Sequence, residues 1–289
     1  MRAFTLLEPS TAREATVMLA THGDDARPIA GGISLLLLLR SRLAHFPVLV
    51  DVSRLRELAM IRHESDGSLV IGALATHAEV AASDRVKATH PVIAEMASAV
   101  ANPQIRNVGT IGGNLCFGDP ASDPPTCLTA LDARVRVLRD RETREIPIDA
   151  FFRGYYESAL EIGDLVTEIV VPPLPPGGLA LYSRFTANAA EGRPLASIGV
   201  RVVGAAAGEW SGVRIAVGAV SSQPRRALAA ESLLTDSRPT RDRAVEAASA
   251  AARDIEPMND FRASDEYRRT VVRVVLRRVL ERAMEASQR

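Results

Sequence analysis

The sequence predicts an α+β fold built from two successive domains, and three observations lead to this prediction. A chain of 289 residues is long enough for two or three units that each bury a core. In its first part, continuous apolar segments alternate with segments whose apolar residues have helical spacing. In its last part, predicted strands are followed by predicted helices. Between them lies a proline- and glycine-rich segment, 172–178, which is typical of a boundary. The predicted domains are 1–176 and 177–289.

The first subdomain, about 1–55, should be a β-α-β unit. Residues 11–21 carry an apolar stripe with helical spacing. Ile29 and Ala30 should form a strand, and a glycine-containing loop then leads into a helix that reaches about residue 43. The continuous apolar run at 48–51 predicts a strand covered on both faces.

In the second subdomain, about 56–176, the turn signal Asp66-Gly67 precedes the first predicted strand. Strands are predicted at 69–71, 134–139 and 165–171, and helices at 76–82, 91–101 and directly after Asp123. Residues 134–139 alternate charged and apolar side chains, which indicates a strand with one wet face.

The second domain should contain antiparallel strands at 179–185, 198–203 and 213–220, then helices at 240–255 and 264–286. The last helix places one stripe of valines and one of arginines along its length: Val271, Val275 and Val279, and Arg269, Arg273 and Arg277. The arginine stripe should face solvent or a partner subunit.

Composition excludes several classes of function. Apolar residues make up 47% of the chain and charged residues 24%, as in soluble globular proteins. A net charge of zero argues against nucleic acid or an anionic membrane as a partner. The N-terminus lacks the apolar stretch of a signal peptide, and the longest apolar run, Leu35–Leu39, is too short to span a bilayer. We therefore expect a cytoplasmic protein without a membrane span.

The chemistry-bearing side chains predict no catalytic residue and no metal site in this chain. Two cysteines, Cys116 and Cys127, are too few for a self-contained iron–sulfur cluster and should be buried free thiols. The five histidines are scattered without ligand spacing. The chain has no nucleophile elbow and no Walker lysine, which excludes a serine hydrolase and a P-loop enzyme.

Two glycine-containing loops carry the functional signal. In the segment 108–114, VGTIGGN, the β-branched pair Thr110 and Ile111 leads into two glycines, and the earlier segment 29–34, IAGGIS, begins with a short apolar stretch. Glycines permit positive φ and close approach, so backbone amides can turn outward and form a nest for phosphate oxygens. Two such loops suit a ligand with two phosphates. Asp123 could then accept hydrogen bonds from ribose hydroxyls, Ser34 should cap the helix after the first loop, and Ser122 or Asp123 should cap the later one.

The pairing of AGGIS at 30–34 with TIGGN at 110–114 resembles the flavin-binding medium subunit of the molybdenum hydroxylases. This family includes carbon monoxide dehydrogenase, xanthine dehydrogenase and the N-heteroaromatic dehydrogenases. The resemblance runs from Phe4 to the last helix. It implies a two-subdomain FAD-binding domain of the vanillyl-alcohol-oxidase (PCMH) type, followed by the C-terminal flavoprotein domain.

The resemblance also implies which residues contact FAD. Amides of both loops would bind the pyrophosphate, and Asp123 would meet the adenosine ribose. The full implied set is Ile29, Ala30, Gly31, Gly32, Ile33, Ser34, Leu35, Val100, Thr110, Ile111, Gly112, Gly113, Asn114, Asp123, Val166, Arg184 and Leu195. Two of these depart from the family: Arg184 stands where lysine is common, and Leu195 where several members place tyrosine or isoleucine against the isoalloxazine ring.

As an oxidoreductase subunit of this kind, the chain would pass electrons from a small subunit with two [2Fe–2S] clusters to a quinone, NAD⁺ or oxygen. A large molybdopterin subunit would oxidise carbon monoxide or a (hetero)aromatic compound, and the whole would be a dimer of heterotrimers. Two alternatives remain open from the residues alone. One is a self-sufficient FAD oxidoreductase with its own organic substrate, and the other is a non-catalytic nucleotide-binding subunit.

Overall fold

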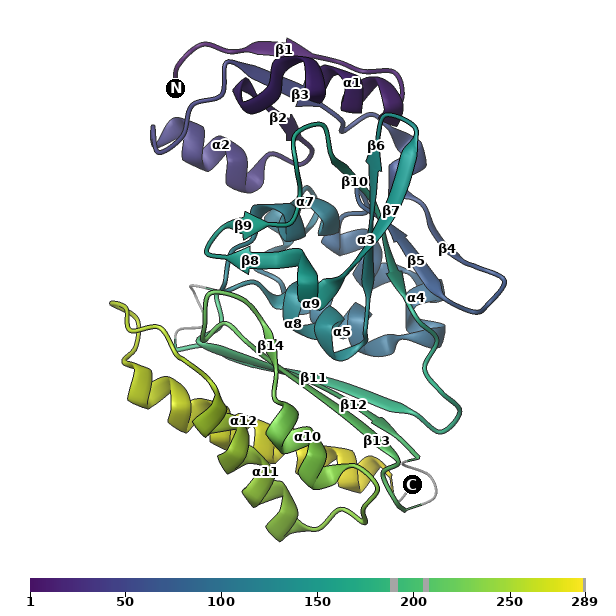
Figure 1. Cartoon of the computed structure of the whole chain (residues 1–289), viewed down its shortest axis with the longest axis vertical. Helices are drawn as coiled ribbons and strands as arrows, with labels where there is room; N and C mark the ends of the chain where they lie inside the picture. The colour runs from purple at the N-terminus through teal and green to yellow at the C-terminus, as the bar shows by residue number, and fades with distance from the viewer. Residues whose placement is uncertain (188–191, 205–207, 288–289) are drawn as a thin grey trace.

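The computed structural model describes residues 1–187, 192–204 and 208–287, which form three main sheets stacked along the long axis of the molecule (Figure 1). A small three-stranded sheet lies at one end, a five-stranded sheet with its helices in the middle, and a four-stranded sheet with three helices at the other end (Figure 1). This is the predicted α+β fold.

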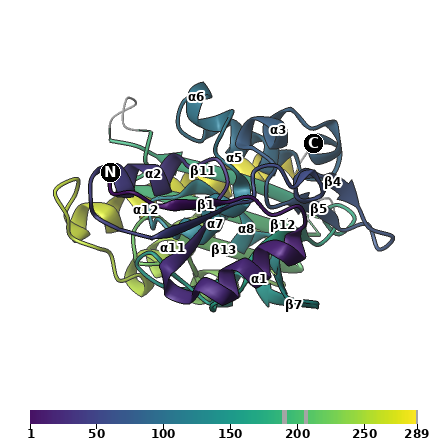
Figure 2. The ribbon, with the colours of Figure 1, turned by 90° about the horizontal axis from the view of Figure 1, so that it is seen from above.

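The N-terminal sheet is entirely parallel, with strand order β1-β3-β2. Its elements are β1 (Thr5–Leu7), α1 (Ala12–His22), η1 (Gly23–Asp25), β2 (Ala26–Ile29), α2 (Ile33–Arg40) and β3 (Val48–Asp51). The predicted β-α-β unit is therefore present. The sheet also contains β1, which was not predicted because a strand of three residues gives no clear pattern in the sequence. Viewed from above, β1 and α1 lie across the rest of the chain (Figure 2). Arg13 of α1 forms an ion pair of 2.9 Å with Asp140, which connects this N-terminal unit to the middle of the molecule.

The middle sheet is antiparallel with order β4-β5-β10-β6-β7. Its strands are β4 (Ile61–His63), β5 (Leu69–Gly72), β6 (Arg134–Arg139), β7 (Glu142–Pro147) and β10 (Leu165–Val171). In β6, Val135 and Val137 are buried, whereas Arg136 on the opposite face pairs with Glu64, Glu145 and Glu168. This alternation is what the sequence predicted.

Short helices supply much of the core around this sheet. They are η2 (Arg56–Ala59), α3 (His77–Ala82), α4 (Asp84–Thr89), α5 (Pro91–Ala99), α6 (Pro103–Arg106), α7 (Ile111–Phe117), α8 (Asp123–Ala130) and α9 (Ile148–Phe151), with a small hairpin of β8 (Phe152–Gly154) and β9 (Glu157–Ser158). Every residue of α8 is buried, because one side packs in the middle core and the other meets the next sheet.

The last sheet has the order β11-β12-β13-β14 and is antiparallel. Its elements are β11 (Leu179–Phe185), β12 (Ala196–Val203), β13 (Gly212–Gly218), β14 (Arg225–Arg226), α10 (Leu228–Leu234), α11 (Arg241–Asp254) and α12 (Asp265–Ala286). One face packs on the helices, with the three valines of the predicted α12 stripe buried and Arg273 and Arg277 exposed. The other face packs on α8, where a hydrogen bond of 2.8 Å joins the Thr126 and Ser197 hydroxyls.

The proline- and glycine-rich segment 172–178 connects β10 of the middle sheet to β11 of the last sheet. We propose this segment as the division between the two domains. None of the helices in the described ranges combines the length and the apolar character needed to cross a membrane.

Candidate functional site

The first glycine loop forms the N-terminus of α2. Gly32 occupies the N-cap position with φ of +70°, a left-handed conformation that favours glycine. No side chain caps this helix, so the prediction that Ser34 caps it is wrong; Ser34 already lies inside the first turn. Within the described chain, the amides of Ile33, Ser34 and Leu35 have no hydrogen-bond acceptor. Unpaired amides at a helix N-terminus attract anions.

The two glycine loops lie against each other in space. A Cβ atom added to Gly31 would stand 1.9 Å from the carbonyl oxygen of Val108 and 3.3 Å from the Cα of Gly109. Only glycine allows this approach. The second loop is fixed from its other side, since the backbone amide of His77 donates to the Gly109 carbonyl at 3.0 Å. The structure therefore joins two sequence motifs at one place.

The amides of the second loop do not face outward as predicted. Ile111 donates to the carbonyl of Ala75 and Gly112 to that of Ala73, both at 2.9 Å. Gly113 donates to the Thr110 hydroxyl at 3.1 Å, which caps α7, and Asn114 donates to the Thr110 carbonyl. The prediction of outward amides is wrong here, because this turn is the beginning of a helix that docks on the loop after β5.

Instead of free amides, the second loop presents open space and polar side chains to a ligand. Gly113 is exposed, and a Cβ atom added there would meet only the Thr110 hydroxyl within 4 Å. Gly112 has a packing role, because its Cβ would lie 2.5 Å from that of Ala73. The Asn114 side chain accepts a hydrogen bond from the Ser122 hydroxyl. Ser122 stands at the N-cap position of α8 but makes no capping hydrogen bond, so that prediction is also wrong.

Asp123 lies in a buried polar group at the start of α8. It is 4% exposed, accepts a hydrogen bond of 2.6 Å from the Tyr182 hydroxyl and pairs with Arg184 at 3.0 Å. Burial raises the pKa of Asp123 to about 6, although Arg184 and Tyr182 act in the opposite direction. Arg184 also donates to the carbonyls of Ala99 and Gly192. Ribose hydroxyls that bind at Asp123 would have to share its carboxylate oxygens with Tyr182 and Arg184.

Four of the apolar residues in the predicted set have side chains inside the protein. These are Val100, Ile111, Val166 and Leu195, with exposures of 7, 0, 5 and 1%. The first three belong to the middle core. The Leu195 carbonyl accepts a hydrogen bond of 2.9 Å from the fully buried Arg268. In contrast, Ile29, Ala30 and Leu35 near the first loop are partly exposed.

Sequence reasoning missed three polar residues around the site. Tyr182 could have been found, because the alternation of β11 places it on the same face as Arg184. His77 and Arg268 gave no signal, since nothing in the sequence brings His77 beneath Gly109 or Arg268 to Leu195. His77 is 2% exposed, and its Nδ1 has no partner in the described structure. Burial, helped by Arg106, lowers the pKa of His77 to about 4.

The two cysteines are free, as predicted. Cys127 is buried and Cys116 partly so, and burial raises the pKa of both thiols, that of Cys116 to about 12. Among the described residues, no group of three or more His, Cys, Asp or Glu side chains is placed so that it could hold a metal ion.

Comparisons with known proteins agree over almost the whole chain. A family model described as "FAD binding domain in molybdopterin dehydrogenase" matches residues 2–174, and one described as "CO dehydrogenase flavoprotein C-terminal domain" matches 187–283. The chain is 34% identical to the 6-hydroxypseudooxynicotine dehydrogenase complex subunit alpha of Paenarthrobacter nicotinovorans, covering 99% of this chain and 96% of that protein. It is 33% identical to the carbon monoxide dehydrogenase medium chain of Afipia carboxidovorans, covering 97% and 96%.

Solved structures show the same architecture. Carbon monoxide dehydrogenase from Hydrogenophaga pseudoflava superimposes with a TM-score of 0.93 at 33% identity, covering 99% of this chain and 98% of that one. Quinoline 2-oxidoreductase from Pseudomonas putida 86 gives 0.92 at 27% identity, covering 100% and 99%. The two paired glycine loops fall within the first matched domain. The chain belongs to the family of FAD-binding medium subunits of the molybdenum hydroxylases, an oxidoreductase family.

Proposed function

We propose that this chain carries FAD as an electron-transfer subunit, between the iron–sulfur clusters of a partner subunit and an external acceptor. The observation that supports this most is the meeting of the two glycine loops beside the unpaired amides of α2, inside the region matched by the FAD-binding domain. Bound FAD would supply the redox chemistry, and this chain would supply position and shielding.

The residues present fit the pyrophosphate of FAD. The amides of Ile33, Ser34 and Leu35 would donate to its oxygens, and the α2 dipole would favour its negative charge. Gly32 and Gly113 leave room for close approach of the phosphates. The remaining predicted contacts, including Thr110, Asn114 and Asp123, stay part of this proposal.

Electrons would arrive from another chain. Two cysteines cannot hold an iron–sulfur cluster that requires four thiolates. The names of two relatives, a dehydrogenase complex subunit alpha and a carbon monoxide dehydrogenase medium chain, support a complex of several subunits. We propose a large molybdopterin subunit and a small subunit with two [2Fe–2S] clusters as the partners. The substrate of the complex would be carbon monoxide or a (hetero)aromatic compound, and the acceptor a quinone, NAD⁺ or oxygen.

A charge placed in the first turn of α2 tests the phosphate site. Ser34→Asp should reduce FAD affinity at least tenfold, because a carboxylate there repels phosphate. The same carboxylate interacts favourably with the helix N-terminus, by about 0.3–1 kcal/mol, so the FAD-free protein should not be destabilised. FAD per protein chain after dialysis, from the visible absorbance, and the Tm of the FAD-free form are the measurements.

The matched control is Ser34→Asn, which has nearly the same shape without the charge and should retain FAD. Equal FAD content in Ser34→Asp and Ser34→Asn would place the phosphates elsewhere.

Turnover by the isolated chain separates electron transfer from independent catalysis. Loaded with FAD but without other subunits, the wild-type chain should oxidise neither carbon monoxide nor a heteroaromatic compound. Steady oxidation of an organic substrate by this chain alone would support the self-sufficient oxidoreductase instead. A pure protein without flavin absorbance after expression with ample FAD would support the non-catalytic subunit.

A further inference from the structure

Three arginine side chains line a hollow at the edge of the last sheet, away from the glycine loops. Arg201 lies on β12, Arg214 on β13 and Arg226 on β14. The hollow has a volume of about 470 Å³ and extends to α10, where Leu228 and Thr235 contribute to its wall. No residue of either glycine loop lines it.

The strand register places these arginines on one face of the sheet. Arg201 is paired directly with Arg214, and Arg226 is paired with Ala216, two residues further along the same face of β13. This face also carries Gly199 and Gly218, which pack on α8, so the arginines lie beyond the end of that helix. Like charges paired across strands repel each other unless an opposite charge lies between them.

Only two carboxylates serve the three guanidinium groups. Asp132, just after α8, pairs with Arg201 at 2.8 Å and with the Nε of Arg214 at 2.5 Å. Glu231 is 5% exposed and is occupied by Arg226 together with the backbone amide of Ile215. In the described residues, Arg201 and Arg214 therefore share one carboxylate, that of Asp132, whereas Arg226 pairs with Glu231. This group of ion-paired side chains therefore carries three positive charges and two negative ones.

This excess charge is partly removed from water. The side chains of Arg201 and Arg214 are 15% and 28% exposed. Burial is also the main cause that lowers the pKa of Arg214. An excess of like charge that is partly removed from water is costly, and a guanidinium group presents paired N–H donors that match the oxygens of phosphate. An anion in the hollow would balance the charge and use these donors.

We propose that this hollow binds a small phosphate-bearing anion, at a site separate from the two glycine loops that are proposed to bind FAD. The shared chemistry is a phosphate group held by the guanidinium groups of Arg201, Arg214 and Arg226, which all line the hollow. The phosphate is either free or carried by a small organic molecule, for which the hollow has room.

The test uses FAD-loaded protein in phosphate-free buffer, with sodium chloride at matched ionic strength as the reference. Inorganic phosphate, pyrophosphate and AMP are each titrated while Tm is followed. At saturation, phosphate or one of the other two should raise Tm by about 2 °C or more over chloride. A response to AMP at lower concentration than to phosphate assigns the site to phosphate on an organic carrier, and the reverse assigns it to the free ion.

Arg214→Gln is the decisive variant, because it leaves one guanidinium group for each carboxylate. It should fold with unchanged or higher Tm in chloride and lose the response to all three anions. Arg214→Lys keeps the positive charge but lacks the paired N–H donors of a guanidinium group, so it should retain a weaker response.

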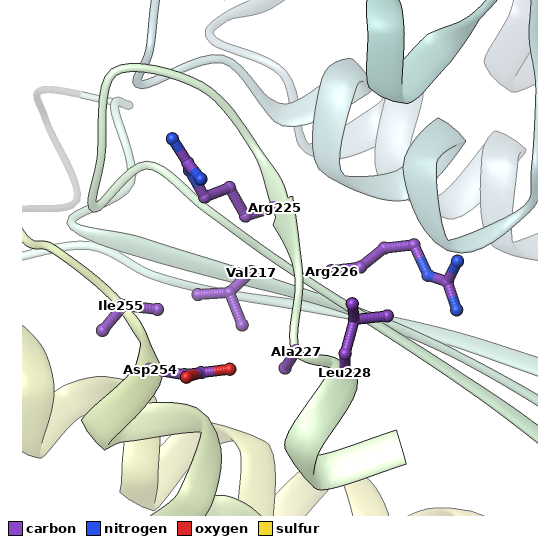
Figure 3. A pocket seen from close by; sticks show the side chains of 7 residues that line it. All are labelled: Val217, Arg225, Arg226, Ala227, Leu228, Asp254 and Ile255. Carbon is purple, nitrogen blue, oxygen red and sulfur yellow. The ribbon is translucent and has the colours of Figure 1, made fainter. Parts of the chain in front are cut away.

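Arg225→Gln is the matched control: Arg225 neighbours Arg226 in sequence but points away from it, into a different hollow (Figure 3). It should respond like the wild type. The proposal fails if no anion exceeds chloride, or if Arg214→Gln keeps the full response. FAD content, recorded for every variant, shows separately whether the flavin site is intact.

Discussion

At the scale of single residues, Arg184 joins three parts of the chain through one guanidinium group. It pairs with Asp123 at the start of α8 and donates to the carbonyls of Ala99, at the end of α5, and Gly192. Because Arg184 is itself 14% exposed, it has little solvent to replace these partners. Its first role is therefore to join the middle core to the last sheet.

Removing this group should be costly. Arg184→Met is expected to lower the free energy of unfolding by about 3–5 kcal/mol, because it leaves the Asp123 carboxylate buried without its cation. Urea unfolding at pH 7.5 measures the loss. The double variant Asp123→Asn/Arg184→Met should recover part of it, since no buried charge then remains.

Arg193 provides the comparison, because its ion pair with Asp119 has an arginine that is 54% exposed. Arg193→Met should cost about 1 kcal/mol or less. Equal losses in Arg184→Met and Arg193→Met would show that the buried group has no special role.

His77 gives the chain a specific dependence on pH. The pKa of His77 is lowered from 6.5 to about 4 by burial. Between pH 6.5 and about 4, His77 is protonated in the unfolded chain but neutral in the folded chain. The contribution of neutral His77 to stability is therefore complete above pH 6.5 and is lost as the pH falls toward 4, by about 3 kcal/mol.

Replacement of His77 by leucine tests this linkage. The free energy of unfolding of His77→Leu should fall less steeply than that of the wild type between pH 6.5 and 4. Parallel profiles for the two proteins would mean that His77 protonates freely in the folded state.

At the scale of elements, the contact between the glycine loops is the feature on which FAD binding depends in the proposed function. Gly31→Ala would place a Cβ 1.9 Å from the Val108 carbonyl, so the loops must separate. We expect FAD affinity to fall at least tenfold, measured by titration of FAD-free protein with FAD. Gly23→Ala, where a Cβ meets nothing within 4 Å, loses another glycine of positive φ and should keep its FAD.

The elements themselves were largely predictable, and the contacts between them were not. Strands such as β6, β10 and β11 have the predicted bounds, because alternating or continuous apolar residues are a local signal. The amides of Ile111 and Gly112 were misread because their acceptors, Ala75 and Ala73, belong to a distant loop. The position of Asp123 between Tyr182 and Arg184 is likewise set by packing of one domain on another, which no local pattern encodes.

At the scale of the whole molecule, this chain should be one part of a larger enzyme. Native mass spectrometry of the complex purified from its own host is expected to show this chain with a large and a small partner, each present twice. Molybdenum and iron should co-purify, because the proposed partners hold them. A stable, active oligomer of this chain alone, without either metal, would contradict the assignment.

The parallel β1-β3-β2 sheet has a further consequence for the life of the protein in the cell. Its core is small, and its α2 end forms half of the proposed FAD site, while the other half, around Gly109, belongs to the middle of the chain. A ligand that bridges both halves stabilises the folded state in proportion to the logarithm of its concentration. Newly made chains that lack flavin would open first at this end and be degraded first. The supply of flavin would then set how much of the proposed subunit a cell retains.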